Sequence, residues 1–192
     1  MGYSQAQKAE SKRRVLEVAS RQIRENGIEA LGVADCMRSA GLTHGAFYGH
    51  FASRDALIVE ALEHALGQSE KRMASRTPDE DSAQTPLGAI AEPFLSEVHA
   101  KNPGNGCALC ALAGEARHAN DEVRALLTRY VQQLASRIAK AVGHEGETAG
   151  LGIVATIVGA ITLARTVDDD DLAKSILASS LALVMSQDLA VQ

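Results

Sequence analysis

The chain has 192 residues, of which 46% are hydrophobic, 22% charged and 3% aromatic. This composition is typical of a globular protein and excludes a disordered chain and a large multidomain enzyme. The net charge is −5, which excludes a wholly basic nucleic-acid coat, but residues 1–24 carry six basic and only two acidic side chains. A basic end on an acidic body indicates that this end meets a polyanion.

Cysteine use and the amino-terminal sequence predict a cytoplasmic protein. There are three cysteines, an odd number, and residues 1–14 are polar and charged, unlike a secretory signal. The most apolar stretch, 149–164, is shorter than the roughly 20 residues that a membrane span requires. We therefore expect a reduced protein without membrane contact, in which this stretch is a buried helix.

Helical periodicity, interrupted by glycine and proline, predicts an all-α protein of about nine helices. Asn26-Gly27 is a typical helix end, Thr43 and Ser53 are expected to cap helices, and Pro93 should bend one. The acidic run 168–171 is expected to cap the last helix rather than bind calcium. The expected helices are 8–26, 33–40, 43–51, 54–76, 86–100, 107–119, 121–142, 148–166 and 170–187, with a mobile linker at 77–85.

Residues 34–51 have the pattern of a helix-turn-helix. Gly41 supplies a turn with positive φ, Leu42 anchors it, and Phe47 and Phe51 share the face that packs inward. Small residues on the opposite face would let the backbone approach base edges in the major groove. The residues expected to contact DNA are Thr43, His44, Gly45, Ala46, Tyr48, Gly49, His50 and Arg54.

Simpler interpretations of individual residues stay open. His44 could be merely an exposed helix residue, and His50 could mainly support Phe51. Arg13 and Arg14 could form a solvated face or contact phosphates. Cys36 is expected to be plain core, because free cysteine packs as a small hydrophobe.

Residues 15–62, and above all GLTHGAFYGHFASRDALIVEAL (41–62), resemble the DNA-binding domain of the tetracycline-repressor (TetR) family. Arg54 replaces the usual lysine of that pattern. Gly32 and Ala34 also depart from it, because Gly32 caps a helix less well than Ser or Thr and Ala34 cannot read a base by hydrogen bonding. Base recognition is therefore expected mainly from His44, the small close-approach residues and Tyr48.

The resemblance implies a domain organisation and a function. Residues 1–53 would form a three-helix DNA-binding domain, 54–76 a connecting helix, and 77–192 a helical domain for ligand binding and dimerisation. GCALCALAGEARHA and GAITLARTVDD add a weaker likeness to one branch of such regulators. The implied function is a homodimeric repressor that a small-molecule effector releases from double-stranded operator DNA.

Cys107 and Cys110 form a CxxC pair with several possible roles, the simplest being that both merely line a pocket or the core. A zinc site would need His99 and His118 as further ligands, and we expect neither a metal nor a cofactor. If Asn105 caps the following helix, Cys107 lies in its first turn, where a thiolate is favoured. An oxidant- or electrophile-sensing regulator is thus the main alternative, and a helical thiol enzyme a weaker one. No other catalytic residue set is detectable, so we expect no enzyme.

A ligand pocket is expected between helices 86–100, 107–119 and 121–142, where Pro93 leaves room. The candidate ligand-binding residues are Phe94, Val98, His99, Cys107, Leu109, Leu112 and His118. The last two helices carry apolar surfaces suited to a four-helix bundle between two copies, although burial within one monomer is the alternative. The candidate dimer residues are Val154, Ile157, Val158, Ile161, Leu177 and Leu181.

Overall fold

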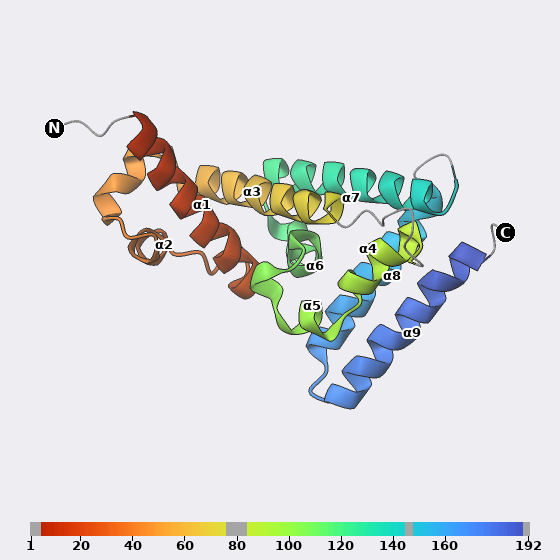
Figure 1. Ribbon diagram of the computed structural model, residues 1–192. Helices are drawn as coiled ribbons and strands as arrows, with labels where there is room; N and C mark the ends of the chain where they lie inside the picture. Colours follow the sequence, from red (N-terminus) through yellow and green to blue (C-terminus); the bar gives the residue numbers. More distant parts are fainter. Residues whose placement is uncertain (1–4, 76–83, 145–147, 190–192) are drawn as a thin grey trace.

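The computed structural model describes residues 5–75, 84–144 and 148–189. Over these ranges the chain forms nine α-helices and three short 3-10 helices with no strand, as the sequence predicts (Figure 1). Most of the expected linker lies outside the described residues. The elements are α1 (Gln5–Asn26), α2 (Val33–Ser39), η1 (His44–Gly49), α3 (Arg54–Ala74), α4 (Pro86–Phe94), α5 (Glu97–Lys101), η2 (Pro103–Asn105), α6 (Ala108–Leu112), η3 (Ala116–His118), α7 (Asp121–Ala141), α8 (Thr148–Thr166) and α9 (Asp170–Leu189).

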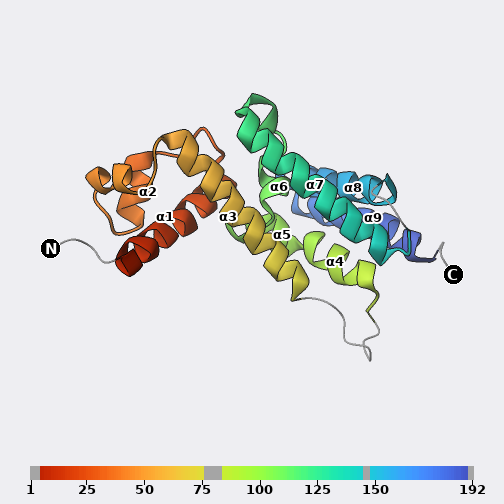
Figure 2. The ribbon, with the colours of Figure 1, turned by 90° about the horizontal axis from the view of Figure 1, so that it is seen from above.

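The amino-terminal elements form a small group at one end of the molecule. Figures 1 and 2 both place α1, α2 and the beginning of α3 together, away from α8 and α9. The helix ends follow the sequence signals: α1 stops before Gly27 and α2 before the turn at Gly41, whose φ angles are 88° and 73°. Ser53 caps α3 by accepting the backbone N–H of Ala56 at 3.0 Å.

The helix that follows the turn differs from the prediction. Residues 44–49 form a 3-10 helix, and Thr43 makes no side-chain capping bond. Two glycines in six residues lower the stability of an α-helix, and short segments then readily take the tighter 3-10 form. The cap expected at Thr43 is therefore wrong, whereas Phe47 and Phe51 are both buried as expected.

Two long helices expected in the middle of the chain are broken into shorter ones. The segment 86–100 divides after Pro93, and Ser96 starts α5 by accepting the N–H of His99 at 3.2 Å. The segment 107–119 contains only the five-residue α6 and the short η3. Cys107, rather than Asn105, is the N-cap residue of α6, so the expected first-turn position of Cys107 is wrong.

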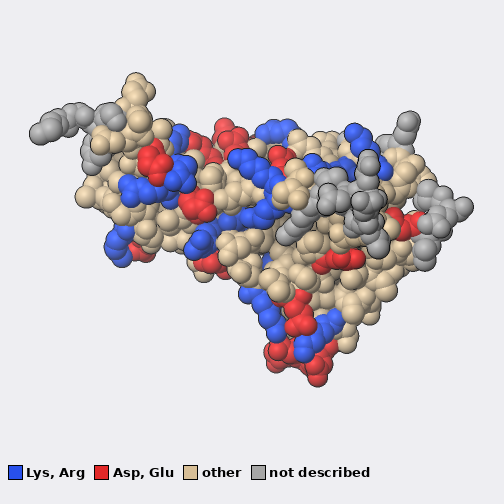
Figure 3. All heavy atoms as spheres, in the orientation of Figure 1, with Lys and Arg blue, Asp and Glu red and all other residues tan. Residues whose placement is uncertain are grey.

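The carboxy-terminal helices pack as a layer in which α8 contacts both α7 and α9. Gly150 is required there, since a Cβ atom at this position would overlap the Ala135 carbonyl of α7. By length and composition α8 would suffice to cross a membrane, but here it packs against its two neighbours. Asp169 caps α9 by accepting the N–H groups of Asp171 and Leu172. Figure 3 shows the acidic side chains gathered at the lower tip, where α8 and α9 meet.

This layer buries most of the residues expected at a dimer interface. Val154, Ile157, Ile161 and Leu177 belong to the core of the single chain, and Val158 and Leu181 are half-buried. Packing of α8 between α7 and α9 covers the apolar stripe that the sequence left without a partner. The exposed large apolar side chains of these two helices are instead Leu151, Leu163, Leu172 and Leu183.

Candidate nucleic-acid interface and ligand cavity

Aromatic rings pack beneath η1 and leave its outer surface exposed. The rings of Phe47 and Phe51 stack with their centroids 5.7 Å apart, and Phe47 also meets Tyr48 edge-on at 5.2 Å. Tyr48 itself is 73% exposed. Burial of a large aromatic side chain is favourable, so a surface that exposes one in this way is typically a surface that contacts another molecule.

Most of the predicted DNA-contacting residues share this exposed surface. Thr43, His44, Gly45, Tyr48 and Gly49 are exposed, whereas Ala46 is half-buried. A Cβ atom at Gly45 or Gly49 would meet nothing within 4 Å. The fold itself therefore does not require glycine at either position, and close approach of another molecule is a physical reason for both.

His50 and Arg54 are turned toward the protein. His50 is half-buried, and burial, followed by the charges of Lys8 and Lys12, lowers its pKa below the ordinary value. Arg54 donates from Nε to the carbonyl of Leu31 and from Nη2 to those of Ile28 and Glu29, at 2.8–3.0 Å. These bonds make Arg54 a positioning residue for the loop between α1 and α2, a role that the sequence pattern does not reveal.

The structure gives Arg13 and Arg14, for which the sequence predicts the same possible roles, different surroundings. Arg13 is bonded to Glu10 on the same helix, with an Nη2–Oε1 distance of 2.6 Å. Arg14 makes no ion pair among the described residues and lies beside the turn, where a Cβ atom at Gly41 would be 3.5 Å from Nη1. Arg14 is therefore the better placed of the two for a phosphate next to η1.

A cavity of about 190 Å³ opens between α3, α4, α5 and the segment that contains η2. Four of the predicted ligand residues line it, namely Phe94, Val98, His99 and Cys107. Leu109 and Leu112 lie in the core and His118 is exposed, and none of these three lines the cavity. The wall opposite α4 and α5 comes from α3 instead of α7. The lining from α3 consists of Ser69, Arg72 and Met73.

His99 and Cys107 are joined through the backbone. The ring of His99 donates from Nδ1 to the Phe94 carbonyl at 2.7 Å and accepts the Cys107 N–H at Nε2 at 3.0 Å. This pair of bonds requires the neutral Nδ1–H tautomer. His99 thus positions Cys107. No cluster of three metal-ligating side chains is found in the described part of the chain.

The Cys107 thiol differs from the other two. A hydrogen bond from the Cys110 thiol, with further help from backbone N–H groups and the Tyr130 hydroxyl, lowers the pKa of Cys107 to about 6 despite burial. Its sulfur lies 3.8 Å from the Tyr130 oxygen. Burial alone raises the pKa of Cys36 to about 11, which agrees with its predicted place in the core.

Two residues that follow α5 in the chain, Gly104 and Glu115, contact the amino-terminal elements. Glu115, just before η3, accepts the backbone N–H of Ile28 at 2.9 Å. Gly27 leaves room for that carboxylate, and Gly104 of η2 leaves room for Glu25 at the end of α1. A displacement of η2 would therefore reach α1 directly.

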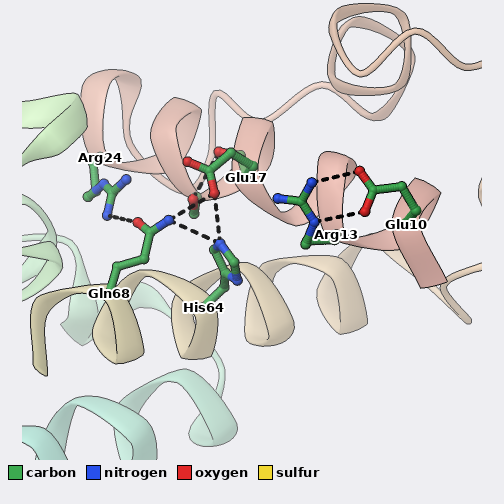
Figure 4. Close-up of polar contacts among 7 residues, drawn as sticks. Glu10, Arg13, Glu17, Arg24, His64 and Gln68 are labelled. Atoms are coloured by element: carbon green, nitrogen blue, oxygen red, sulfur yellow. Dashed lines mark hydrogen bonds and ion pairs between the residues drawn. The ribbon is translucent and has the colours of Figure 1, made fainter. Parts of the chain in front are cut away.

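A polar network joins α1 and α3 along their length (Figure 4). Glu17 Oε2 accepts from His64 Nε2 at 3.0 Å and from Gln68 Nε2 at 2.9 Å, and Gln68 Oε1 accepts from Arg24 at 3.2 Å. The bond from His64, above all, lowers the pKa of Glu17. These contacts tie α1 to α3.

A short helix presented after a glycine turn, on an all-helical body, defines the class of helix-turn-helix transcription regulators. Residues 15–61 match the sequence profile of the bacterial regulatory proteins, tetR family. This segment therefore carries the DNA-binding domain of that family, as the resemblance of residues 15–62 implies.

Relatives agree with this assignment. An uncharacterized HTH-type transcriptional regulator of Bacillus subtilis (strain 168), YerO, is 32% identical over 77 residues, 40% of this chain but only 26% of its own length. A second one from the same organism, YvdT, is 26% identical over 72% of this chain and 70% of its own length. A solved TetR transcriptional regulator from Chloroflexus aurantiacus J-10-FL has the same fold, with a TM-score of 0.77, 21% identity and coverage of 94% and 95% of the two chains.

Proposed function

We propose that this protein is a cytoplasmic, homodimeric repressor that binds operator DNA through η1 and is released by a small molecule bound in the cavity. The observation that carries the proposal is the open surface of η1, where Tyr48 is exposed and two glycines have free space above them. The residues proposed to meet the groove are His44, Gly45, Tyr48 and Gly49. Arg14 is proposed to contact a flanking phosphate, and residues 1–53 form the DNA-binding unit.

The effector is proposed to act through the two elements that both line the cavity and support the DNA-binding unit. One is α3, which supplies Arg72 to the cavity and begins at Arg54 beside the loop that follows α1. The other is the segment of η2, whose Gly104 packs on Glu25. A ligand shifts the equilibrium only if it binds the DNA-incompetent arrangement more tightly.

Dimerisation is proposed to use the outward faces of α8 and α9. Leu163 and Leu183 are 55% and 58% exposed there, and a methyl group added at Gly152 or Gly159 would meet no atom within 4 Å. Two copies joined at this end would present two η1 helices to successive major grooves, about 34 Å apart. Leu163→Glu should then halve the mass measured by light scattering, whereas Ala125→Glu on the exposed face of α7 should not.

The main experiment is a mobility-shift assay with DNA from upstream of the protein's own gene. His44→Ala and Tyr48→Ala should each weaken binding about tenfold or more, because each removes a contact to bases or phosphates. His144→Ala, an exposed histidine far from η1, is the matched control. Unchanged affinity in both His44→Ala and Tyr48→Ala would contradict the proposal.

A second candidate function is a thiol-responsive regulator, which the low pKa of Cys107 favours. The Cys107 thiolate would attack a peroxide, breaking its O–O bond and releasing an alcohol or water. The resulting sulfenic acid would condense with the Cys110 thiol, giving a disulfide and one water molecule. Cys107→Ser should then abolish the release of DNA by peroxide, while Cys36→Ser should leave it intact. Equal release by peroxide in wild type and Cys107→Ser would remove this candidate.

A further inference from the structure

Positive charge around the cavity is not balanced by carboxylates. The guanidinium groups of Arg24, Arg72 and Arg165 lie near Cys107, and none of them forms an ion pair among the described residues. Glu17 attracts Arg24 without contacting it, and hydrogen bonds through Gln68 link the two side chains. Because no carboxylate pairs with these groups in the described part of the chain, positive charge remains beside the cavity.

Arg24 is the most confined of these groups. It is only 4% exposed, its Nη1 donates to Gln68, and its Nε has no hydrogen-bond partner in the described part of the chain. Burial, and after it the charge of Arg72, lowers its pKa to about 10. Two neighbouring arginines without a counter-ion are costly, and an anion placed between them and solvent would relieve that cost.

Arg72, unlike Arg24, lines the cavity. Its Nη2 donates to the Gly106 carbonyl and to Ser69 Oγ, both at 3.3 Å, and these two residues also line the cavity. Nε and Nη1 have no hydrogen-bond partner among the described residues, and either can donate a charge-assisted hydrogen bond to a carboxylate oxygen.

The rest of the lining combines apolar side chains with the polar residues Ser96, His99, Asn102 and Asn105. Met73, Pro93 and Phe94 form the wall, and Val98, 76% exposed, stands at the rim. A cavity of about 150 Å³ admits benzene. The observed volume of about 190 Å³ therefore suits one six-membered ring with one small polar substituent.

We propose that the cavity binds a monocyclic carboxylate, whose carboxylate group pairs with Arg72 and whose ring lies against Met73 and Phe94. This inference rests on the proposed ligand-binding role of the cavity and names the chemical class of the effector. Arg24 adds long-range attraction, and Ser69 holds Arg72 in place by accepting its Nη2–H.

The test is calorimetric titration of the full chain with benzoate and with benzamide, a neutral molecule of the same shape. Benzoate should bind at least about tenfold more tightly, since only the anion makes charge-assisted hydrogen bonds. Arg72→Gln should remove that preference, and Arg129→Gln, an exposed arginine on α7, should keep it. Where Arg72→Gln fails to fold, the ratio measured on the wild type decides.

Equal binding of benzoate and benzamide, no binding of benzoate, or an unchanged preference in folded Arg72→Gln would each overturn the inference. None of these outcomes touches the DNA-binding proposal, because operator affinity is measured without benzoate. If the wild type binds benzoate as expected and ignores its upstream DNA, the carboxylate site stands and the repressor proposal fails.

Discussion

The carboxylate of Glu115 accepts the backbone N–H of Ile28 across 2.9 Å, joining the body of the protein to the loop that follows α1. The two residues are 87 positions apart in sequence. This contact ties the segment before η3 to the proposed DNA-binding unit, and it is the basis of the first prediction.

Glu115→Ala should uncouple ligand binding from DNA release. The substitution leaves the Ile28 N–H without its partner, which should lower the free energy of unfolding by about 1 kcal/mol. Operator affinity without ligand should be nearly unchanged, while the ligand-induced loss of affinity should shrink. Glu115→Gln keeps an acceptor oxygen and serves as the control in urea unfolding and mobility-shift assays. A full ligand response in Glu115→Ala would refute the coupling.

Arg54→Ala should destabilise the protein rather than only weaken DNA binding. Three carbonyl groups lose a charged donor, so the unfolding free energy should fall by about 2 kcal/mol, as measured in urea. Arg54→Lys should recover part of this loss, because one ammonium cannot reproduce the planar guanidinium fork. If Arg54 acted only on phosphates, the stability of Arg54→Ala would equal that of the wild type.

Gly45→Ala should separate folding from DNA binding. The added methyl group meets no atom within 4 Å, and alanine reduces the entropy of the unfolded chain, so thermal stability should be equal or higher by about 0.5 kcal/mol. Operator affinity should nevertheless fall, because the methyl group would stand between η1 and the bases. Gly150→Ala provides the opposite case, with lost stability from overlap with Ala135. Full DNA affinity in Gly45→Ala would argue against close approach at this position.

Stability should depend on Glu17 in mildly acidic solution. The pKa of Glu17 is lowered in the folded protein from the ordinary value of 4.5, chiefly by the hydrogen bond from His64. Its contribution to stability is therefore present above pH 4.5 and is lost as the pH falls below that value through the lowered pKa. Unfolding measured against pH should show this loss in wild type and a smaller one in Glu17→Gln. Glu63→Gln, exposed on α3, should behave like the wild type.

The sequence by itself determined the all-helical class and the helix-turn-helix. The signals for both are local: glycines at the ends of α1 and α2, the serine cap of α3, and two phenylalanines four residues apart. Such signals act between neighbours in the chain, so they can be read without knowing what packs against them.

Only the tertiary structure decided what the distant residues do. Arg54 looks like a phosphate contact until the carbonyls of the preceding loop are seen around it. The apolar stripe of α8 looks like a dimer surface until α7 and α9 cover it. The arginines near Cys107 come from α1, α3 and α8, and no pattern in the sequence places them together. Which residues contact each other depends on how distant helices pack. Several helix faces have a similar apolar composition, so any of them could pack together, and only the tertiary structure shows which of them do.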